Sequence, residues 1–107
     1  MVTLSIIIVN WNTKRLVINC LESIYKNISE QSFEIWVVDN NSTDGSVSMI
    51  NENFPMVNLI TNRENIGFAK ANNRAITAIH SKYILLLNPD TLLMSDPITN
   101  IIHSTPQ

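Results

Sequence analysis

YILLLNPDT, residues 83–91, joins an apolar run to a polar turn that carries a single carboxylate, Asp90. A continuous run of Ile and Leu predicts a strand that is covered on both faces, as in a parallel sheet. Residues 4–9 and 33–38 repeat this pattern, and residues 57–60 form a shorter apolar segment. A polar, asparagine-rich loop follows each of the four segments. The sequence therefore predicts four buried strands with polar tips.

Helical periodicity separates these strands. Apolar residues recur at helical spacing between Leu16 and Ile24, after the pair Asn12-Thr13, which can cap a helix. A shorter pattern begins at Asp44 or Ser46 and ends before a proline. A third apolar face runs from Phe68 to Ile79, and Ser95-Asp96-Pro97 is typical of another helix start.

Strands and helices thus alternate along the whole chain. Right-handed crossovers would arrange them as one α/β domain with an open, doubly wound, mostly parallel sheet in the strand order 3-2-1-4. Ligands of such sheets bind beyond the carboxyl ends of the strands. We therefore expect any functional site among the loops at residues 10–12, 39–44, 62–67 and 88–91.

Composition excludes several functions. The chain has 107 residues, seven basic and nine acidic side chains and a net charge of −2, without a basic run, which argues against nucleic acid as a partner. Gly45 and Gly67 are the only glycines, so neither a dinucleotide-binding nor a P-loop motif can be written. His80 and His103 are isolated, and no zinc cluster is present.

The compartment is predicted to be the cytoplasm. Cys20 is the only cysteine, so no intramolecular disulfide can form, and its place in an apolar helical stripe predicts a buried structural thiol. The first residues lack the basic start of a signal peptide, and no apolar run is long enough to form a transmembrane segment.

Two carboxylates at strand tips suggest a chemistry. Asp39 can accept hydrogen bonds from a base N–H or a ribose hydroxyl. Asp90, with the amide oxygen of Asn88, can hold one hard divalent cation such as Mg²⁺ or Mn²⁺. The alternative for residues 88–91 is an ordinary proline turn.

The combination of four motifs is more specific than any one of them. SIIIVNWN (5–12), EIWVVDNNSTDGS (34–46), NIGFAKANNRA (65–75) and YILLLNPDT (83–91) stand in this order, each at a strand-to-loop junction. Together they resemble the amino-terminal portion of family 2 glycosyltransferases. These are inverting enzymes with a GT-A fold, which is Rossmann-like in its nucleotide-binding half. The NPD form is similar to that of a rhamnosyltransferase-like branch, where it replaces the D-x-D metal motif.

The resemblance implies a hexosyltransferase-type activity that uses a UDP- or dTDP-sugar in polysaccharide or cell-wall synthesis. It implies a metal site formed by Asn88 and Asp90 with Mg²⁺ or Mn²⁺. For Trp11 the alternative is a ring that covers the first helix, and for Lys70 it is a solvated charge. The residues that the resemblance places around the nucleotide are Asn10, Trp11, Asn12, Asp39, Asn40, Asn65, Gly67, Lys70 and Asn73.

The same resemblance implies that the catalytic general base lies after the metal motif. Asp96 is the only acid after Asp90, and we expect it to cap a helix, so residues 1–107 are expected to form a donor-binding portion without a catalytic residue. The fourth strand would then be an apolar edge, and we expect self-association through it or through the terminal helix. Two other functions stay open: a non-catalytic nucleotide-sugar binding module, and an α/β domain with a structural or interaction role.

Overall fold

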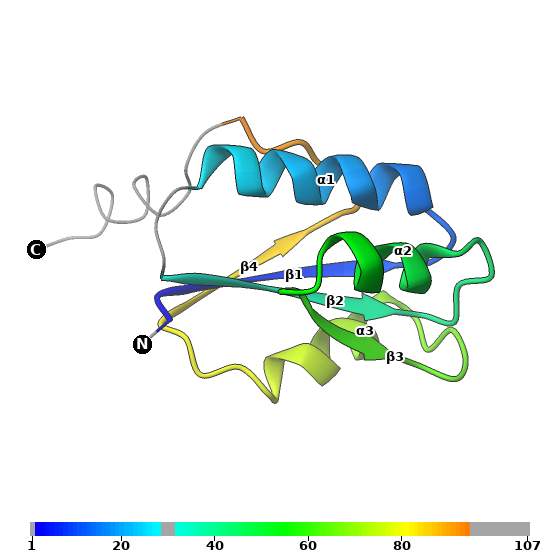
Figure 1. Ribbon diagram of the computed structural model, residues 1–107. Helices are drawn as coiled ribbons and strands as arrows, with labels where there is room; N and C mark the ends of the chain where they lie inside the picture. Colours follow the sequence, from blue (N-terminus) through cyan, green and yellow to red (C-terminus); the bar gives the residue numbers. More distant parts are fainter. Residues whose placement is uncertain (1, 29–31, 95–107) are drawn as a thin grey trace, which may run out of the picture.

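The computed structural model describes residues 2–28 and 32–94, so the helix expected to begin at Ser95-Asp96-Pro97 lies outside the described residues (Figure 1). Four parallel strands form one sheet in the order β3-β2-β1-β4. This confirms the predicted fold class and strand order. The strands are β1 (Leu4–Asn10), β2 (Phe33–Asp39), β3 (Asn58–Thr61) and β4 (Tyr83–Leu87).

The burial of the central strand, β1, explains why its sequence has the continuous apolar pattern that is typical of a parallel sheet. All seven residues of β1 are buried, because β2 and β4 flank it and helices cover both of its faces. Its register pairs Asn10 with Asp39, so both predicted tip residues are the last residues of their strands. Parallel pairing therefore brings an amide and a carboxylate together at one edge of the sheet.

Helices form a layer on each face of the sheet (Figure 1). One core contains residues of α1 (Lys14–Asn27) and α2 (Ser46–Asn53), together with Leu4, Ile6 and Ile8 of β1. A smaller core on the opposite face packs Ala71 and Ala75 of α3 (Phe68–Ile76) against Ile7, Val9 and Val38. Small side chains let α3 lie close to the sheet.

Strands β1, β2 and β3 each end one residue later than predicted, and two further element ends also differ. Strand β3 begins at Asn58 rather than Val57, because the Val57 N–H donates to the Phe54 carbonyl (3.0 Å) and closes a turn. Helix α3 ends at Ile76, although Ile79 of the predicted face still packs against the smaller core. The chain leaves the helix through turn bonds from Ala78 and Ile79 to Ala75 and Ile76.

Strand β4 departs from the prediction of a strand covered on both faces. Its side toward α1 is packed, whereas Ile84 and Leu86 on the α3 side are 41% and 45% exposed. Within residues 2–28 and 32–94, α3 contacts β1 and β2 and leaves this side of β4 open. Over the same residues, every helix is too short or too polar to cross a bilayer.

Candidate functional site

A buried carboxylate organises the carboxyl end of the sheet. Asp39 is 1% exposed, and its Oδ1 accepts hydrogen bonds from Asn10 Nδ2 (2.8 Å) and Ser42 Oγ (2.7 Å). Its Oδ2 accepts a third bond from the Ser42 N–H (2.8 Å). These three donors compensate the desolvation of the charge. A carboxylate has about four lone-pair sites, so these three donors fill most of the acceptor capacity of Asp39.

Asn10 extends this network toward the first loop. It is fully buried, its side-chain nitrogen donates to Asp39, and its Oδ1 accepts a bond from Thr13 Oγ1 (2.6 Å). The Asn10 carbonyl also accepts the Asn40 N–H (2.9 Å). Asn10, Asp39 and Asn40 therefore lie together, as the sequence predicted, but they are held in the core rather than displayed on the surface.

The loops after β1 and β2 bind each other directly. Asn12 has a positive φ of 53°, and its side-chain oxygen accepts the Thr43 N–H (2.7 Å) while its own N–H donates to Ser42 Oγ (2.9 Å). Asparagine tolerates this left-handed conformation better than most residues. The two loops thus form one hydrogen-bonded rim beside Asp39.

The start of α1 is capped from a distance, which corrects one prediction. Neither Asn12 nor Thr13 caps this helix with its side chain. Instead, Asp44 Oδ2 accepts the Lys14 N–H (2.9 Å), and Asp44 Oδ1 accepts the N–H (3.0 Å) and hydroxyl of Ser46. One carboxylate therefore serves the first turns of α1 and α2.

These contacts also affect the protonation of Asp44. Desolvation acts to raise its pKa, but the hydrogen bonds from the Ser46 hydroxyl and from the backbone of Lys14 and Ser46 outweigh it and lower the pKa below the usual Asp value. Asp44 is thus held in its charged, accepting form.

The third loop is joined to this rim through side-chain amides. Asn62 Nδ2 donates to Asn40 Oδ1 (2.8 Å), and Asn40 Nδ2 donates to the Gly67 carbonyl (3.3 Å). Arg74 Nη1 donates to Asn62 Oδ1. Asn65 Oδ1 accepts the Gly67 N–H (2.9 Å), and Gly67 has a positive φ of 87° just before α3. The predicted residues Asn40, Asn65 and Gly67 are therefore brought together.

Three further predicted residues lie exposed around this network. Trp11 is 53% exposed at the tip of the first loop. Lys70 and Asn73 are exposed on α3. Their side chains are not hydrogen-bonded to the buried network in the described part of the chain. They are accessible to a ligand, and their roles stay predictions.

The residues of the NPD turn stand apart from the other loops. Asn88 and Asp90 are both exposed, and the Thr91 N–H closes the turn on the Asn88 carbonyl (3.0 Å). The chain then folds back over α1, where the Leu93 N–H donates to Ser23 Oγ (2.9 Å). No hydrogen bond among residues 2–28 and 32–94 joins the side chains of Asn88 or Asp90 to the Asp39 network.

The donor atoms of this turn fit a divalent cation in an open site. The described residues contain no cluster of three His, Cys, Asp or Glu side chains. Asn88 and Asp90 would supply two oxygen ligands, which leaves positions for water and a diphosphate, as Mg²⁺ sites commonly require. One carboxylate with one amide is therefore compatible with a cation that a substrate shares.

Cys20 has the predicted buried position. It is fully buried in α1, and burial, together with the nearby charge of Asp90, raises its pKa to about 11. A thiol of this kind stays protonated at neutral pH and packs as a small apolar group. The prediction of a structural thiol is confirmed.

Sequence reasoning missed the residues that hold the loops in place. Ser42, Asp44, Asn62 and Arg74 each bind a group at least twelve positions away or in another loop. The position of Asn62 directly after a strand could have indicated a role at this edge of the sheet. Its hydrogen-bond partners, however, depend on the order of the strands in the sheet. None of these partners is apparent from spacing along the chain.

Comparison with known proteins agrees with this geometry. Residues 5–104 match the family model described as glycosyl transferase family 2. The teichoic acid poly(glycerol phosphate) polymerase of Staphylococcus epidermidis is 33% identical over 100 residues, which are 90% of this chain and 14% of that protein. The uncharacterized glycosyltransferase YfnE of Bacillus subtilis is 30% identical over 101 residues, which are 92% of this chain and 26% of that protein.

A solved structure has the same fold. The mannosyltransferase PcManGT of Pyrobaculum calidifontis, determined with GDP-Man and Mn²⁺, superposes with a TM-score of 0.83 and 26% identity over 96% of this chain and 32% of that one. The chain thus spans between 14% and 32% of the lengths of these three proteins. Because the family model covers almost the whole sequence and the fold agrees, this chain belongs to glycosyl transferase family 2.

Proposed function

We propose that residues 1–107 form the donor-binding portion of an inverting glycosyltransferase. The enzyme would transfer a sugar from a nucleotide-diphospho-sugar to an acceptor hydroxyl. The observation that carries this proposal is the Asp39 network, which ties the loops after β1 and β2 into one polar rim at the carboxyl end of the sheet. Ligands of open α/β sheets bind at this edge.

The nucleoside would lie over this rim. Trp11, Asn12, Asn65 and Asn73 are exposed and would offer an aromatic face and amide groups to a base and a ribose. Asp39 would contact the base through its remaining lone-pair site. Because Asp39 is buried, this contact requires a shift of the loop at residues 40–44.

The diphosphate would lie toward Asn88 and Asp90. When bound, a Mg²⁺ or Mn²⁺ ion would neutralise charge on the nucleoside diphosphate leaving group. Asp90 would supply the anionic ligand and Asn88 an amide oxygen, and Lys70 would contribute a positive charge from α3. The acceptor oxygen would bond to the anomeric carbon as the bond to the diphosphate oxygen breaks. The general base that takes the acceptor proton is expected outside residues 1–107.

The known relatives support this proposal at the level of chemistry. PcManGT was solved with a nucleotide sugar and Mn²⁺, and the Staphylococcus epidermidis relative is named for the synthesis of a cell-wall polymer. We therefore propose a UDP-, dTDP- or GDP-linked donor and a role in polysaccharide or cell-wall synthesis, in the cytoplasm. Self-association through the open side of β4 is also part of the proposal, since Ile84 and Leu86 are exposed there.

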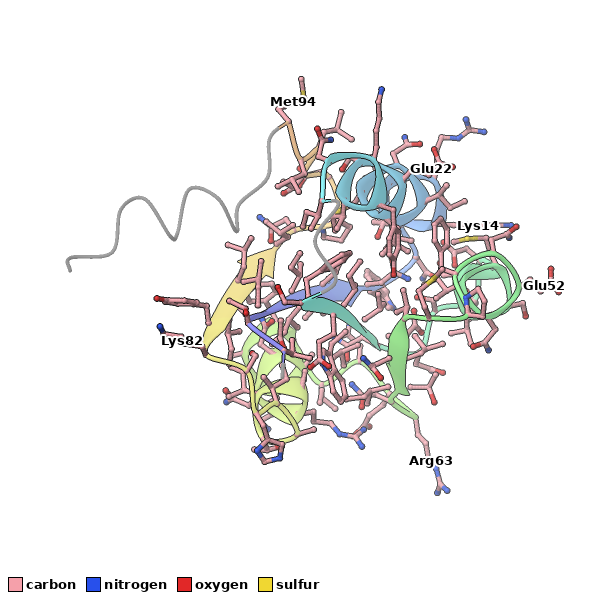
Figure 2. All side chains as sticks on the ribbon, turned by 60° about the vertical axis from the view of Figure 1, so that its left-hand side comes forward. Lys14, Glu22, Glu52, Arg63, Lys82 and Met94 are labelled. Atoms are coloured by element: carbon pink, nitrogen blue, oxygen red, sulfur yellow. The ribbon has the colours of Figure 1, made fainter. Side chains whose placement is uncertain are left out.

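Calorimetric titration tests the donor site. The protein is titrated with UDP, dTDP and GDP, with and without Mn²⁺, and compared with Asp39→Ala and Asp90→Ala. We expect one nucleotide to bind more tightly with Mn²⁺, loss of binding in Asp39→Ala, and loss of the Mn²⁺ effect in Asp90→Ala. Glu22→Ala is the matched control, because Glu22 points outward from α1 on the surface (Figure 2). A folded protein that binds none of the three nucleotides would disprove the proposal.

A further inference from the structure

Three side chains form a directed chain of hydrogen bonds behind the third loop, which we call the amide relay: Arg74, Asn62 and Asn40. Arg74 donates to Asn62 Oδ1, Asn62 Nδ2 donates to Asn40 Oδ1 (2.8 Å), and Asn40 Nδ2 donates to the Gly67 carbonyl (3.3 Å). Asn62 and Asn40 are 7% and 2% exposed, so water cannot easily replace the bond between them, whereas Arg74 is exposed.

The direction of the amide relay follows from the chemistry of its first member. A guanidinium has only donors, so it requires the oxygen of Asn62 to face it. The nitrogen of Asn62 must then face Asn40, which presents its oxygen in return. The nitrogen of Asn40 is thereby aimed at the Gly67 carbonyl, which can only accept. Arg74 at one end and the Gly67 carbonyl at the other thus favour the same orientation of the two buried amides.

The amide relay joins separate elements at the proposed donor site. Asn40 follows β2, Asn62 follows β3 and Arg74 is on α3. Backbone bonds from the N–H groups of Asn40 to Asn10 (2.9 Å) and of Asn62 to Asp39 (2.8 Å) attach both amides to the strand tips. The last acceptor, Gly67, directly precedes α3. Its position therefore affects where the start of α3, with Lys70 and Asn73, lies.

We propose that Arg74 is a positioning residue for nucleotide binding. It acts through Asn62 and Asn40 to hold the loop at residues 62–67 against the tip of β2, and it does not contact the ligand. Without Arg74, Asn62 Oδ1 loses the donor that ties it to α3, and only the Gly67 carbonyl still favours the native orientation of the two amides. The two amides are then held less firmly, so the loop at residues 62–67 is freer to move. This inference rests on the proposed function only for the location of the nucleotide.

Nuclear magnetic resonance tests the amide relay without any nucleotide. In Arg74→Met we expect shifts in the side-chain amide signals of Asn40 and Asn62 and in the Gly67 amide signal. Arg63→Met is the matched control, because Arg63 is the neighbour of Asn62 in sequence but points into solvent (Figure 2). Arg74→Lys also places a donor-only group there, and we expect partial recovery of the signals. Unchanged Asn40 and Asn62 signals in Arg74→Met would overturn the amide relay.

A second variant distinguishes a positioning role of Arg74 from a direct effect of its charge on the nucleotide. Asn62→Ala keeps the charge of Arg74 and adds no charge, but it can neither accept a bond from Arg74 nor donate one to Asn40. We expect Arg74→Met to weaken nucleotide binding by about fivefold, the effect of one lost hydrogen bond. We expect Asn62→Ala to weaken it at least as much, and Arg63→Met to change it less than twofold.

The binding outcomes are distinguishable from failure of the proposed function. Weaker binding in Arg74→Met with normal binding in Asn62→Ala would show that Arg74 acts through its charge, and the positioning role would be wrong. Shifted amide signals with unchanged affinity in both variants would also refute it. If the unmodified protein binds no nucleotide, the donor-site proposal and the positioning role both fail, while the amide signals still decide whether Arg74 orients the amides.

Discussion

Removal of the shared helix cap at Asp44 should destabilise two helices at once. In Asp44→Ala, the Lys14 N–H at the start of α1 and the Ser46 N–H at the start of α2 both lose their acceptor. Loss of one N-terminal cap costs about 1 kcal/mol, so we expect a decrease of about 2 kcal/mol in the free energy of unfolding. For a domain of this size, that corresponds to a decrease in Tm of roughly 10 °C.

Asp44→Asn provides a graded comparison. An asparagine has one side-chain oxygen, so it can serve one of the two helix starts but not both. We therefore expect a loss of about 1 kcal/mol, half of that in the alanine variant. Glu64→Ala is the control for the loss of one acidic charge, because Glu64 is an exposed acid in the loop after β3.

The pH dependence gives an independent check. Hydrogen bonds lower the folded-state pKa of Asp44, so its contribution to stability is complete above the pKa of the unfolded chain and is lost as the pH falls through the folded-state value. The stability difference between the unmodified protein and Asp44→Ala should be constant from about pH 5 to 8 and should shrink below about pH 4. Thermal unfolding followed by circular dichroism at pH 7 and pH 3 measures this. Equal Tm values for Asp44→Ala and Glu64→Ala at pH 7 would refute the shared cap.

Three other predictions concern separate parts of the molecule. Asn41 has a positive φ of 67°, so Asn41→Val should lower the free energy of unfolding in urea by about 1–2 kcal/mol, and Asn41→Gly by less than about 0.5 kcal/mol. Equal effects of the two substitutions would contradict the argument from backbone strain. Leu86→Lys should abolish the expected self-association, measured by light scattering. Because Leu86 is 45% exposed, it should change the free energy of unfolding by less than about 0.5 kcal/mol. An unmodified protein that is already monomeric would contradict the expected self-association. Cys20, buried and with a pKa of about 11, should react with a thiol reagent at pH 8 only after urea unfolds the chain; rapid labelling of the native protein would show that the thiol is accessible.

Most of the fold could be predicted because it depends on patterns within short segments. Apolar runs at residues 4–9 and 33–38 marked strands that the structure places at the centre of the sheet, and helical spacing marked α1, α2 and α3. The crossover rule then determined the order β3-β2-β1-β4. Strand β4 was predicted as an edge of the described sheet, and it is one. That Ile84 and Leu86 remain exposed could not be predicted, because it depends on which strands α3 covers.

The candidate site was predictable only in its location. Residue types at strand tips pointed to Asn10, Asp39 and Asn40, and the parallel register brings them together. Their burial was not foreseen, since an acid after a strand can be exposed to a ligand or enclosed by the next loop.

The sequence by itself determined the alternation of strands and helices, the edge of the sheet at which polar residues gather, and the family to which the chain belongs. Only the tertiary structure decided which donor meets which acceptor. Asp44 caps a helix thirty residues before it, and Arg74 acts on Asn62, twelve residues away and in a different element. Periodicity describes the faces of single elements, whereas hydrogen bonds between loops depend on the register of the sheet and on where each helix packs.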